Sequence, residues 1–568
     1  MDEQKRLIIA IILSVIVIVG WNFLFIEPVT VDQPPPGSSS QVSDSEKSGS
    51  DKTADIGVED YYTDTKTGHS VPGDSLHGQT SHLPEPEHFE QISVSTPLYN
   101  VVISEKRAAL TSLTLTQYRE EAKENSPLKQ MVAPELTSGL FTFDMEGRGI
   151  PGLDRAVFRA DTDTLHHIIR DREQKISFSW SSPHGMVIEK IYTFYPSTYL
   201  IGMDIVVKNA STMPFKDALE ITLPFAVTKE AKAAAGFAAY GPAFYVDGRL
   251  EEIVPDDIEE TNTFRGTVEW AGNGDRYFIS AVLPREPSDS AVKLSTKGSI
   301  VHTRYVQSME RLDPGKMVHF SFQCYMGPKS LKVLGSYDNN LKKAIYFGWF
   351  DLLAKPCLIA MNMIHDIIPN YGVAIIILTI LIKLIFWPLG TKSYKSMNDM
   401  RKLQPLMMDI REKYKNDRQR MNQEVMSLYK TYKVNPMSGC LPLLVQMPIF
   451  FALYKMLYQA IELRHAPFMG WISDLSAPDR LFDLDVTIPF MQAPYGIPVL
   501  TIIMGASMFL QQKMSPTTGD PIQAKIMMLM PIFMTVIFIN FPAGLVLYWL
   551  VNNVLSIGQQ YYIQKKFS

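Results

Sequence analysis

Cysteine is scarce in this chain of 568 residues, and the few cysteines that occur are widely separated. Their odd number and wide spacing exclude a disulfide framework and the closely spaced thiolates of a zinc site. We interpret all three as free thiols: Cys324, Cys357 and Cys440. The sequence also lacks a phosphate-binding loop, a nucleophile–base pair and any metal-ligand motif, so it predicts neither an enzyme nor a cofactor.

An excess of charge of one sign is also missing, because the net charge is only −5. A strongly basic balance is typical of proteins that bind nucleic acids through phosphate groups, so no specific nucleic acid is predicted as a partner. The length is too great for one ordinary domain, and we expect two or more.

Long apolar runs, in contrast, are abundant. Residues 7–26 are uncharged and follow a short charged start, and a run of this length can span a bilayer. It ends at Glu27 and Pro28 without the small residues of a secretory cleavage site, which favours an uncleaved anchor over a signal peptide. We therefore expect a transmembrane anchor at residues 1–27.

The next two segments differ sharply in composition. Residues 28–90 carry twelve acidic residues against three lysines, with a run of proline, glycine and serine, so a disordered tether is expected. Residues 91–328 are rich in β-branched and aromatic residues, with partial alternation and turn signals at Asn273-Gly274. This pattern predicts one large antiparallel β-sandwich.

The C-terminal part alternates apolar runs with short basic loops. Residues 341–370 are apolar but interrupted by charges and proline, which favours an amphipathic helix at the membrane surface. Five runs of spanning character follow, at residues 371–389, 441–461, 497–510, 526–539 and 545–557. With the anchor they predict a multi-pass α-helical membrane protein of six spans, with a five-helix core at 371–568.

Basic residues in the loops predict the orientation of these spans. Residues 390–440 hold eleven lysines and arginines, whereas residues 462–494 hold only Arg464 and Arg480. We therefore expect both termini on the inside and the β domain on the outside. In a bacterium this means an inner membrane protein with cytoplasmic termini and a periplasmic domain.

Residues 390–440 are expected to form a basic helical hairpin. Apolar residues recur there at three- and four-residue spacing on both sides of a polar break, and many are methionines, which adapt to varied apolar partners. Two alternatives remain open: the hairpin contacts nascent chains and the ribosome, or it buries its own seam. The candidate contact residues are Met407, Met421, Arg411 and Arg418.

Lys383 is the only charged residue in the apolar run 371–389. A charge near the bilayer centre costs at least ~2.5 kcal/mol on insertion scales, so it indicates a functional site. Alternatively, Lys383 reaches the interface, since only six residues, roughly 9 Å of helix, separate it from the end of the run. Its position alone does not distinguish these alternatives.

Six segments of the C-terminal part carry a recognisable pattern: 379–389, 402–405, 433–450, 463–468, 512–516 and 541–549. Together they resemble the YidC/Oxa/Alb family of membrane protein insertases. The anchor and the β domain are similar to the arrangement of the Gram-negative YidC type. The resemblance implies a groove that is open to the cytoplasm and to lipid, with an arginine where this chain has Lys383.

Other groove residues follow from the same resemblance, with ordinary helix packing as the alternative for each. Thr379 lies one turn before Lys383 on the same face, and Gln446 is a polar side chain inside the next span. Met447 and Phe450 would form an apolar slide towards lipid. The complete set expected in the groove is Lys383, Thr379, Gln446, Met447, Phe450 and Trp549.

The resemblance implies an insertase and folding chaperone of the bacterial inner membrane, acting alone or with the Sec translocon. Its expected partners are nascent membrane proteins, the Sec translocon and its accessory subunits, the ribosome or targeting factors, and the lipid bilayer. A small-solute transporter is one alternative, but no internal repeat is visible. A membrane-tethered carbohydrate-binding protein is the other.

Overall fold

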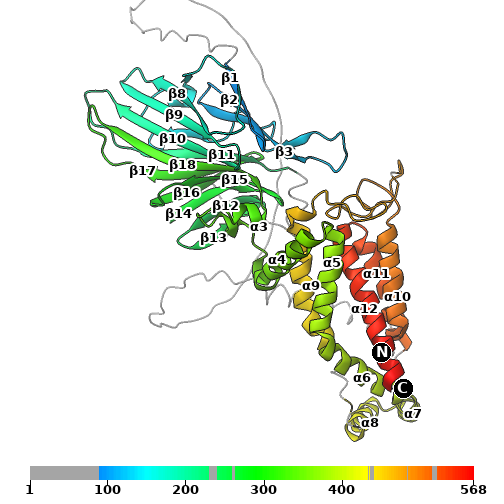
Figure 1. Cartoon of the computed structure of the whole chain (residues 1–568). Coiled ribbons are helices and arrows are strands. Elements are labelled where there is room, and N and C mark those ends of the chain that lie inside the picture. The colour runs from blue at the N-terminus through cyan, green and yellow to red at the C-terminus, as the bar shows by residue number, and fades with distance from the viewer. Residues whose placement is uncertain are drawn as a thin grey trace, which may run out of the picture. The chain divides into compact units, whose positions relative to one another are not determined.

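The structure is a computed structural model, and it describes residues 89–228, 240–258, 262–432, 434, 441–482, 484–514 and 521–567. The predicted anchor, nearly all of the predicted tether and Cys440 lie outside these residues. The described chain comprises a strand-rich part followed by a helical part (Figure 1).

A small sheet opens the strand-rich part, with the order β4-β3-β2-β1-β7. All of its pairs are antiparallel except β1 with β7, which is parallel. The wholly antiparallel domain predicted from the sequence is therefore wrong at this edge, because residue alternation does not encode strand direction. The bounds are β1 Gln91–Ser95, β2 Tyr99–Ser104, β3 Ala109–Arg119, β4 Leu128–Gln130 and β7 His166–Ile168.

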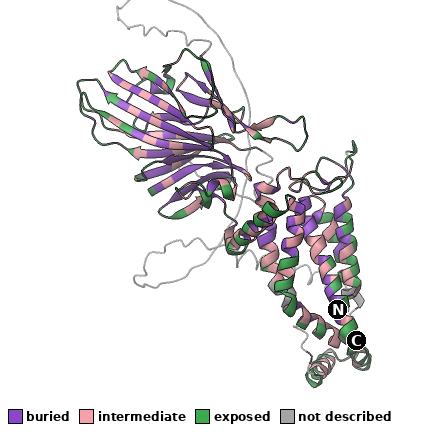
Figure 2. Cartoon of the chain, in the orientation of Figure 1, coloured by how far each residue is buried: buried purple, intermediate pink, exposed green. Residues whose placement is uncertain are grey.

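A larger sheet of 13 strands follows the path β5-β11-β17-β16-β14-β15-β18-β10-β9-β8-β6, and β12 and β13 pair beside β14. Its strands alternate between buried and partly exposed residues, as one covered face requires (Figure 2). The bounds are β5 Thr142–Met145, β6 Arg159–Ala160, β8 Gln174–Ser181, β9 Met186–Phe194, β10 Leu200–Asn209, β11 Ala218–Ala226, β12 Gly241–Val246, β13 Arg249–Glu252, β14 Asn262–Gly274, β15 Phe278–Pro284, β16 Asp289–Lys297, β17 Ile300–Ser308 and β18 Met317–Pro328.

Lys190 on β9 connects the two sheets and is fully buried. Its Nζ donates to the carbonyl of Ala108, just before β3, at 2.9 Å and to that of Phe141, just before β5, at 2.7 Å. The Tyr192 hydroxyl donates to the same Ala108 carbonyl at 2.8 Å. Ala108 and Phe141 both have positive φ, a conformation that costs energy for residues other than glycine. Lys190 therefore satisfies two carbonyls that ordinary strand pairing does not satisfy.

Burial lowers the pKa of Lys190 from its usual 10.5 to about 7. Between these two values the unfolded chain binds the proton more strongly than the folded chain does. The free energy of unfolding should therefore be lowest below pH 7 and rise towards pH 10.5.

We expect this rise to be at most about 1.4 kcal/mol per pH unit. Chemical unfolding of the protein in detergent, followed by the circular dichroism of the strands, measures it. Lys190→Met should abolish the rise, and Lys175→Met, at an exposed lysine of β8, should preserve it. A rise of equal size in both variants would contradict the assignment to Lys190.

The helical part begins after β18. Short 3₁₀ turns lie in this part at Leu341–Ala344, Gly348–Phe350 and Ile461–Leu463. Two others lie among the strands, at Leu153–Arg155 and Pro255–Asp257. The helices are α3 Leu331–Leu334, α4 Asp351–Ile367, α5 Tyr371–Ile385, α6 Trp387–Lys402, α7 Gln404–Lys413, α8 Arg418–Thr431, α9 Leu441–Gln459, α10 Val499–Met514, α11 Pro521–Phe538 and α12 Ala543–Phe567.

Helix α4 is amphipathic. Ala354, Leu358 and Met361 are buried on one side, and an ion pair between Lys355 and Asp351, 2.9 Å apart, lies along the helix. Large apolar side chains are nevertheless exposed on its other faces: Leu352, Ile359, Met363 and Ile367. An exposed apolar surface of this kind is what a helix lying at a membrane surface presents.

Within the described residues, no single helix has both the length and the hydropathy of a membrane span. Helices α5 and α6 together have the length and hydropathy of a span, but the chain bends by 65° between them, at Phe386. The run predicted at 371–389 is therefore two helices. Pro388 lies in the first turn of α6 and has no N–H to continue the hydrogen bonds of α5.

The predicted hairpin is likewise divided into more helices than expected. The apolar pattern suggested one helix from Tyr394 to Tyr414, but the chain breaks at Leu403 between α6 and α7. Pro405, in the first turn of α7, lacks the N–H that a continuous helix would need there. The antiparallel pair is α7 with α8, and α6 continues from α5 instead.

Candidate functional site

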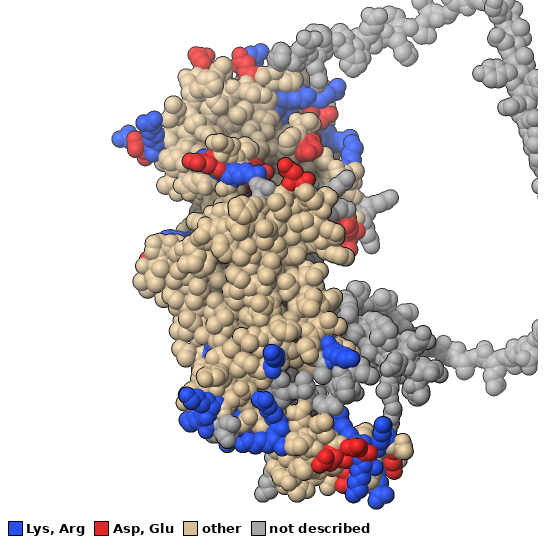
Figure 3. Space-filling view, turned by 90° about the vertical axis from the view of Figure 1, so that its right-hand side faces the viewer, with Lys and Arg blue, Asp and Glu red and all other residues tan. Residues whose placement is uncertain are grey.

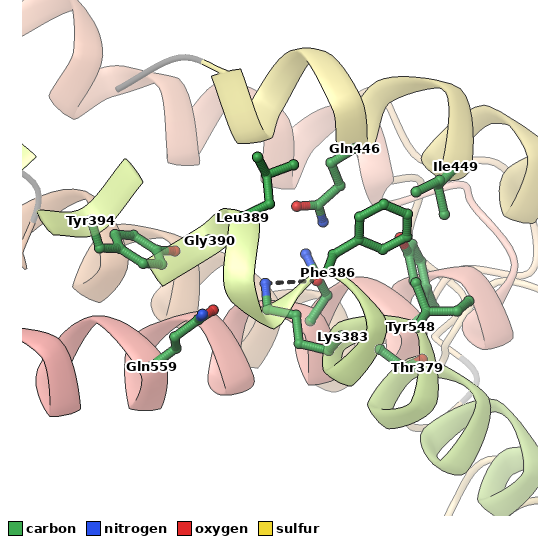
Figure 4. Close-up of a pocket in the computed structure, with 12 residues that line it drawn as sticks. Thr379, Lys383, Phe386, Leu389, Gly390, Tyr394, Gln446, Ile449, Tyr548 and Gln559 are labelled. Atoms are coloured by element: carbon green, nitrogen blue, oxygen red, sulfur yellow. Dashed lines mark hydrogen bonds between the residues drawn. The ribbon is translucent and has the colours of Figure 1, made fainter. Parts of the chain in front are cut away.

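Lys383 lies in the last turn of α5 and points towards α12. Its Nζ donates to Ser556 Oγ at 2.7 Å and, more weakly, to Asn552 Oδ1 at 3.4 Å. Figure 4 marks the second of these hydrogen bonds with a dashed line from Lys383. Ser556 Oγ in turn donates to the carbonyl of Asn552, one turn earlier, at 2.7 Å. Among the described residues no carboxylate pairs with Lys383, and the two acceptors of its Nζ are neutral oxygens.

The Lys383 side chain borders a cavity of about 60 Å³. Thr379, one turn earlier, is buried and donates its hydroxyl to the carbonyl of Ile375 at 2.6 Å. None of the lining residues is acidic. They are Thr379, Ile382, Lys383, Phe386, Leu389, Gly390, Tyr394, Gln446, Ile449, Tyr548, Asn552 and Gln559.

A larger and mostly apolar cavity of about 750 Å³ lies beside it. Four residues line both cavities, so the two adjoin: Tyr394, Gln446, Tyr548 and Asn552. Methionine is the most frequent apolar residue in the wall of the larger cavity. The methionines are Met397, Met447, Met508, Met530 and Met534.

Aromatic rings form one side of the larger cavity. The ring of Phe450 on α9 meets that of Trp549 on α12 edge-on, with 4.6 Å between the centroids. Phe538 on α11 contacts the same indole at 4.8 Å. These contacts join three helices through apolar rings, an arrangement worth about 0.5–1.5 kcal/mol per pair beyond buried area.

The structure brings together all six residues that the sequence placed in a groove. Lys383, Thr379 and Gln446 line the smaller cavity, and Gln446, Met447, Phe450 and Trp549 line the larger one. The sequence analysis did not place two other residues here: Ser556, which accepts a hydrogen bond from Lys383, and Tyr394, which lines both cavities. The signal for Ser556 was the three- and four-residue spacing of polar residues along α12: Asn552, Ser556, Gln559 and Gln560.

The candidate contacts in the hairpin differ in exposure. Met407 is buried and accepts a contact from the Tyr429 hydroxyl of α8 at 3.4 Å, as the packed-seam alternative expects. Met421 and Arg411 are partly exposed, and the side chain of Arg418 lies outside what the structure describes. Two other methionines are more exposed, Met408 at 60% and Met426 at 52%.

Sequence models of known families match almost the whole described chain. A model described as the YidC periplasmic domain matches residues 91–360, and one described as the 60Kd inner membrane protein matches residues 363–568. The membrane protein insertase YidC of Geobacter metallireducens is 38% identical over 569 residues, covering 100% of this chain and 99% of that protein. The chain belongs to the YidC family.

Another YidC insertase, from Syntrophus aciditrophicus, is 43% identical over 483 residues, which is 84% of this chain and 86% of that protein. A crystal structure of an active YidC insertase with its first transmembrane domain resolved aligns with 84% of this chain and 93% of its own, at 18% identity and a TM-score of 0.38. The strand-rich part is thus the periplasmic domain of a YidC-family inner membrane protein, and the helical part follows it.

The packed seam of the hairpin gives a test with neighbouring residues. A photoreactive benzoylphenylalanine in place of Met407 should crosslink to α8, because Tyr429 lies against it. The same group in place of the exposed Met408 should give no crosslink within the chain. Peptide mass spectrometry of the irradiated protein identifies the products. Equal internal crosslinking from both positions would contradict the packing of α7 on α8.

Proposed function

We propose that this YidC-family protein inserts nascent membrane proteins into the bacterial inner membrane, and assists their folding, through a groove formed by the two adjoining cavities. The observation that carries the proposal is the Lys383 ammonium. It is held by neutral oxygens at the edge of a cavity whose lining contains no acidic residue. Such a cation attracts a carboxylate of an incoming chain without first having to release one of its own.

The larger cavity takes the apolar part of the same substrate. Its methionines adapt to varied apolar side chains, and its rings present a smooth apolar wall. A hydrophilic flank can descend along Lys383 while the apolar segment passes into lipid. Each CH₂ group that leaves water for lipid contributes ~0.8 kcal/mol. The reaction therefore needs no covalent step, and partitioning of the substrate drives it.

Six spans, cytoplasmic termini and a periplasmic β domain complete the proposal. On the face of the helical part that Figure 3 shows, a wide band without charge lies next to an end that is rich in lysine and arginine. This end contains α6, α7 and α8, and its positive charge supports a cytoplasmic location. The uncharged band supports contact with the bilayer.

The exposed part of the hairpin is the proposed contact with nascent chains, the ribosome and targeting factors, and the Sec translocon is a proposed partner in the membrane. Met408 and Met426 are the most exposed methionines there, with Met421 and Arg411 partly exposed. The burial of Met407 argues for a role in holding the hairpin together instead. Membership of the YidC family favours insertion over solute transport or carbohydrate binding.

Charge variants at Lys383 test the groove with two substrates that differ only in acidic residues of the translocated tail. Lys383→Arg should insert both at least as well as the parent, because the charge is kept. Lys383→Glu should lower insertion of the acidic substrate more than about tenfold, since two unit charges 4 Å apart interact by ~4 kcal/mol at an effective dielectric of 20. Protease protection in proteoliposomes measures the inserted fraction.

The neutral-tail substrate is the internal control for these variants. Lys383→Glu should affect it much less, and Lys383→Ala should give an intermediate loss for the acidic substrate only. Equal insertion of both substrates by Lys383→Glu, at equal protein level, would show that Lys383 acts only as an anchor at the interface.

The proposed orientation predicts opposite labelling of two exposed sites. A cysteine at Asn416, in the turn between α7 and α8, should resist an impermeant maleimide in spheroplasts, and a cysteine at Met469 should react with it. Lysis of the spheroplasts should make both reactive. Reaction of the Asn416 site before lysis would overturn the topology, while the fold of each part would stand.

A further inference from the structure

The connection between α9 and α10 carries large apolar side chains that no described residue covers. Phe482 is 68% exposed, Val486 is 66% exposed and Phe490 is 82% exposed. We call residues 480–497 the apolar loop. In Figure 1 the connection that contains it, in orange, runs across one end of the bundle, at the ends of α10 and α11.

Two of these residues have a costly backbone conformation. Phe482 has φ 61° and Phe490 has φ 65°, in the left-handed region that bulky residues rarely adopt. Strain of this kind costs about 1–3 kcal/mol per residue and persists only where the surroundings impose it. Packing of the two rings within the protein does not offset this energetic cost, because no described residue covers them.

Hydrogen bonds from Arg480 and Asn540 hold the backbone of the loop at Phe490 and just after it. The Arg480 guanidinium donates to the carbonyls of Pro494 and Gln492 across the loop, and to that of Ile539 at the end of α11. Asn540 donates to the carbonyl of Phe490 at 2.8 Å and accepts from the amide of Gln492 at 2.8 Å. The base of the loop is thereby fixed to the turn between α11 and α12.

A carboxylate fixes the other side of the base. Asp479 Oδ2 accepts from the backbone amide of Leu500, which lies in the first turn of α10, and Asp479 Oδ1 accepts from the indole of Trp471 at 2.6 Å. Hydrogen bonds therefore hold the base of the apolar loop against the ends of α10 and α11. The surfaces of these helices are apolar and exposed: Ile502, Ile503 and Leu510 on α10, and Ile532, Phe533 and Val536 on α11.

We infer that the apolar loop inserts Phe482, Val486 and Phe490 into the headgroup region of the outer leaflet of the membrane. This inference rests on the proposed spanning of α10 and α11. Its support is that exposed apolar side chains lie both on these two helices and on the loop that leads into α10. Aromatic rings favour the membrane interface, and exposed Asp485 limits the depth, because a carboxylate at headgroup level stays hydrated.

A fluorescent NBD group on single cysteines tests the depth. The variants are Phe490→Cys and, to keep both strained phenylalanines, Val486→Cys, each with Cys357 and Cys440 replaced by serine; Cys324 is fully buried and does not label. The full chain is reconstituted in vesicles of phosphatidylethanolamine and phosphatidylglycerol. A nitroxide on the lipid headgroup should quench both probes at least about twofold more than aqueous iodide does.

Two control positions separate this inference from the proposed topology. A probe at Phe533 on α11 should be quenched by a nitroxide on the acyl chain, and a probe at Met213 in the β domain should be quenched by iodide alone. Lack of lipid quenching at Phe533 would refute the proposed spans. Lipid quenching at Phe533 with only iodide quenching at Phe490 and Val486 would refute the inference about the loop.

Two further outcomes are decisive. Shielding of the Phe490 and Val486 probes from both quenchers would overturn the inference in favour of a protein partner or a second copy of the chain. Arg480→Lys should lower headgroup quenching at Phe490, because lysine cannot make the several directed hydrogen bonds of the guanidinium, and should leave the Phe533 probe unchanged. Unchanged headgroup quenching at Phe490 in this variant would contradict the role given to Arg480 in positioning the apolar loop.

Discussion

Hydrogen bonds between α5 and α12 are the constraint on which the two adjoining cavities depend. An ammonium among apolar helices needs acceptors, and Ser556 and Asn552 of α12 supply them to Lys383. The same helix contributes Trp549 to the aromatic wall and Gln559 to the turn after α5, where it donates to the carbonyl of Trp387. One long helix thus sets the position of the cation, the polar cavity and the apolar cavity together.

Close backbone approach supports this arrangement. A Cβ on Gly390 would lie 2.8 Å from the side-chain amide of Gln559, so a larger residue there would displace this side chain of α12. A Cβ on Gly505 of α10 would collide with Thr535 of α11. Small residues at helix contacts are typical of membrane bundles, where burial from water does not drive association. Packing and hydrogen bonds therefore hold the walls of the groove in place.

The sequence identified residues that line the two cavities, whereas it did not reveal the breaks between helices. Lys383 and Gln446 are polar residues within apolar runs, and such residues can be recognised without a structure. Motif resemblance added Phe450 and Trp549, which periodicity alone would have left in an ordinary core. Ser556 was missed because a serine inside a helix is common, and its role depends on what another helix places beside it.

The misplaced boundaries have local causes. Pro388 and Pro405 each lie at the break between two helices where the apolar pattern predicted one continuous helix. The spacing of apolar residues indicates which face of a helix is covered, but it does not indicate where the chain bends. The parallel pairing of β1 with β7 was invisible for a similar reason, since it joins strands about seventy residues apart. Long-range pairing is decided by the whole domain, and no short pattern reports it.

In the proposed topology, the early end of α5 bears on the thickness of the bilayer beside Lys383. Its 15 residues give a helix of about 22 Å, whereas the hydrocarbon core of a typical bilayer is ~30 Å thick. The bilayer becomes thinner next to a short hydrophobic helix, at a cost of a fraction of a kcal/mol per ångström of mismatch. A charged tail that crosses there meets a narrower hydrocarbon slab. In the proposed topology, the bend at Phe386 would lower the barrier to crossing through the geometry of the membrane, independently of any charge on the protein.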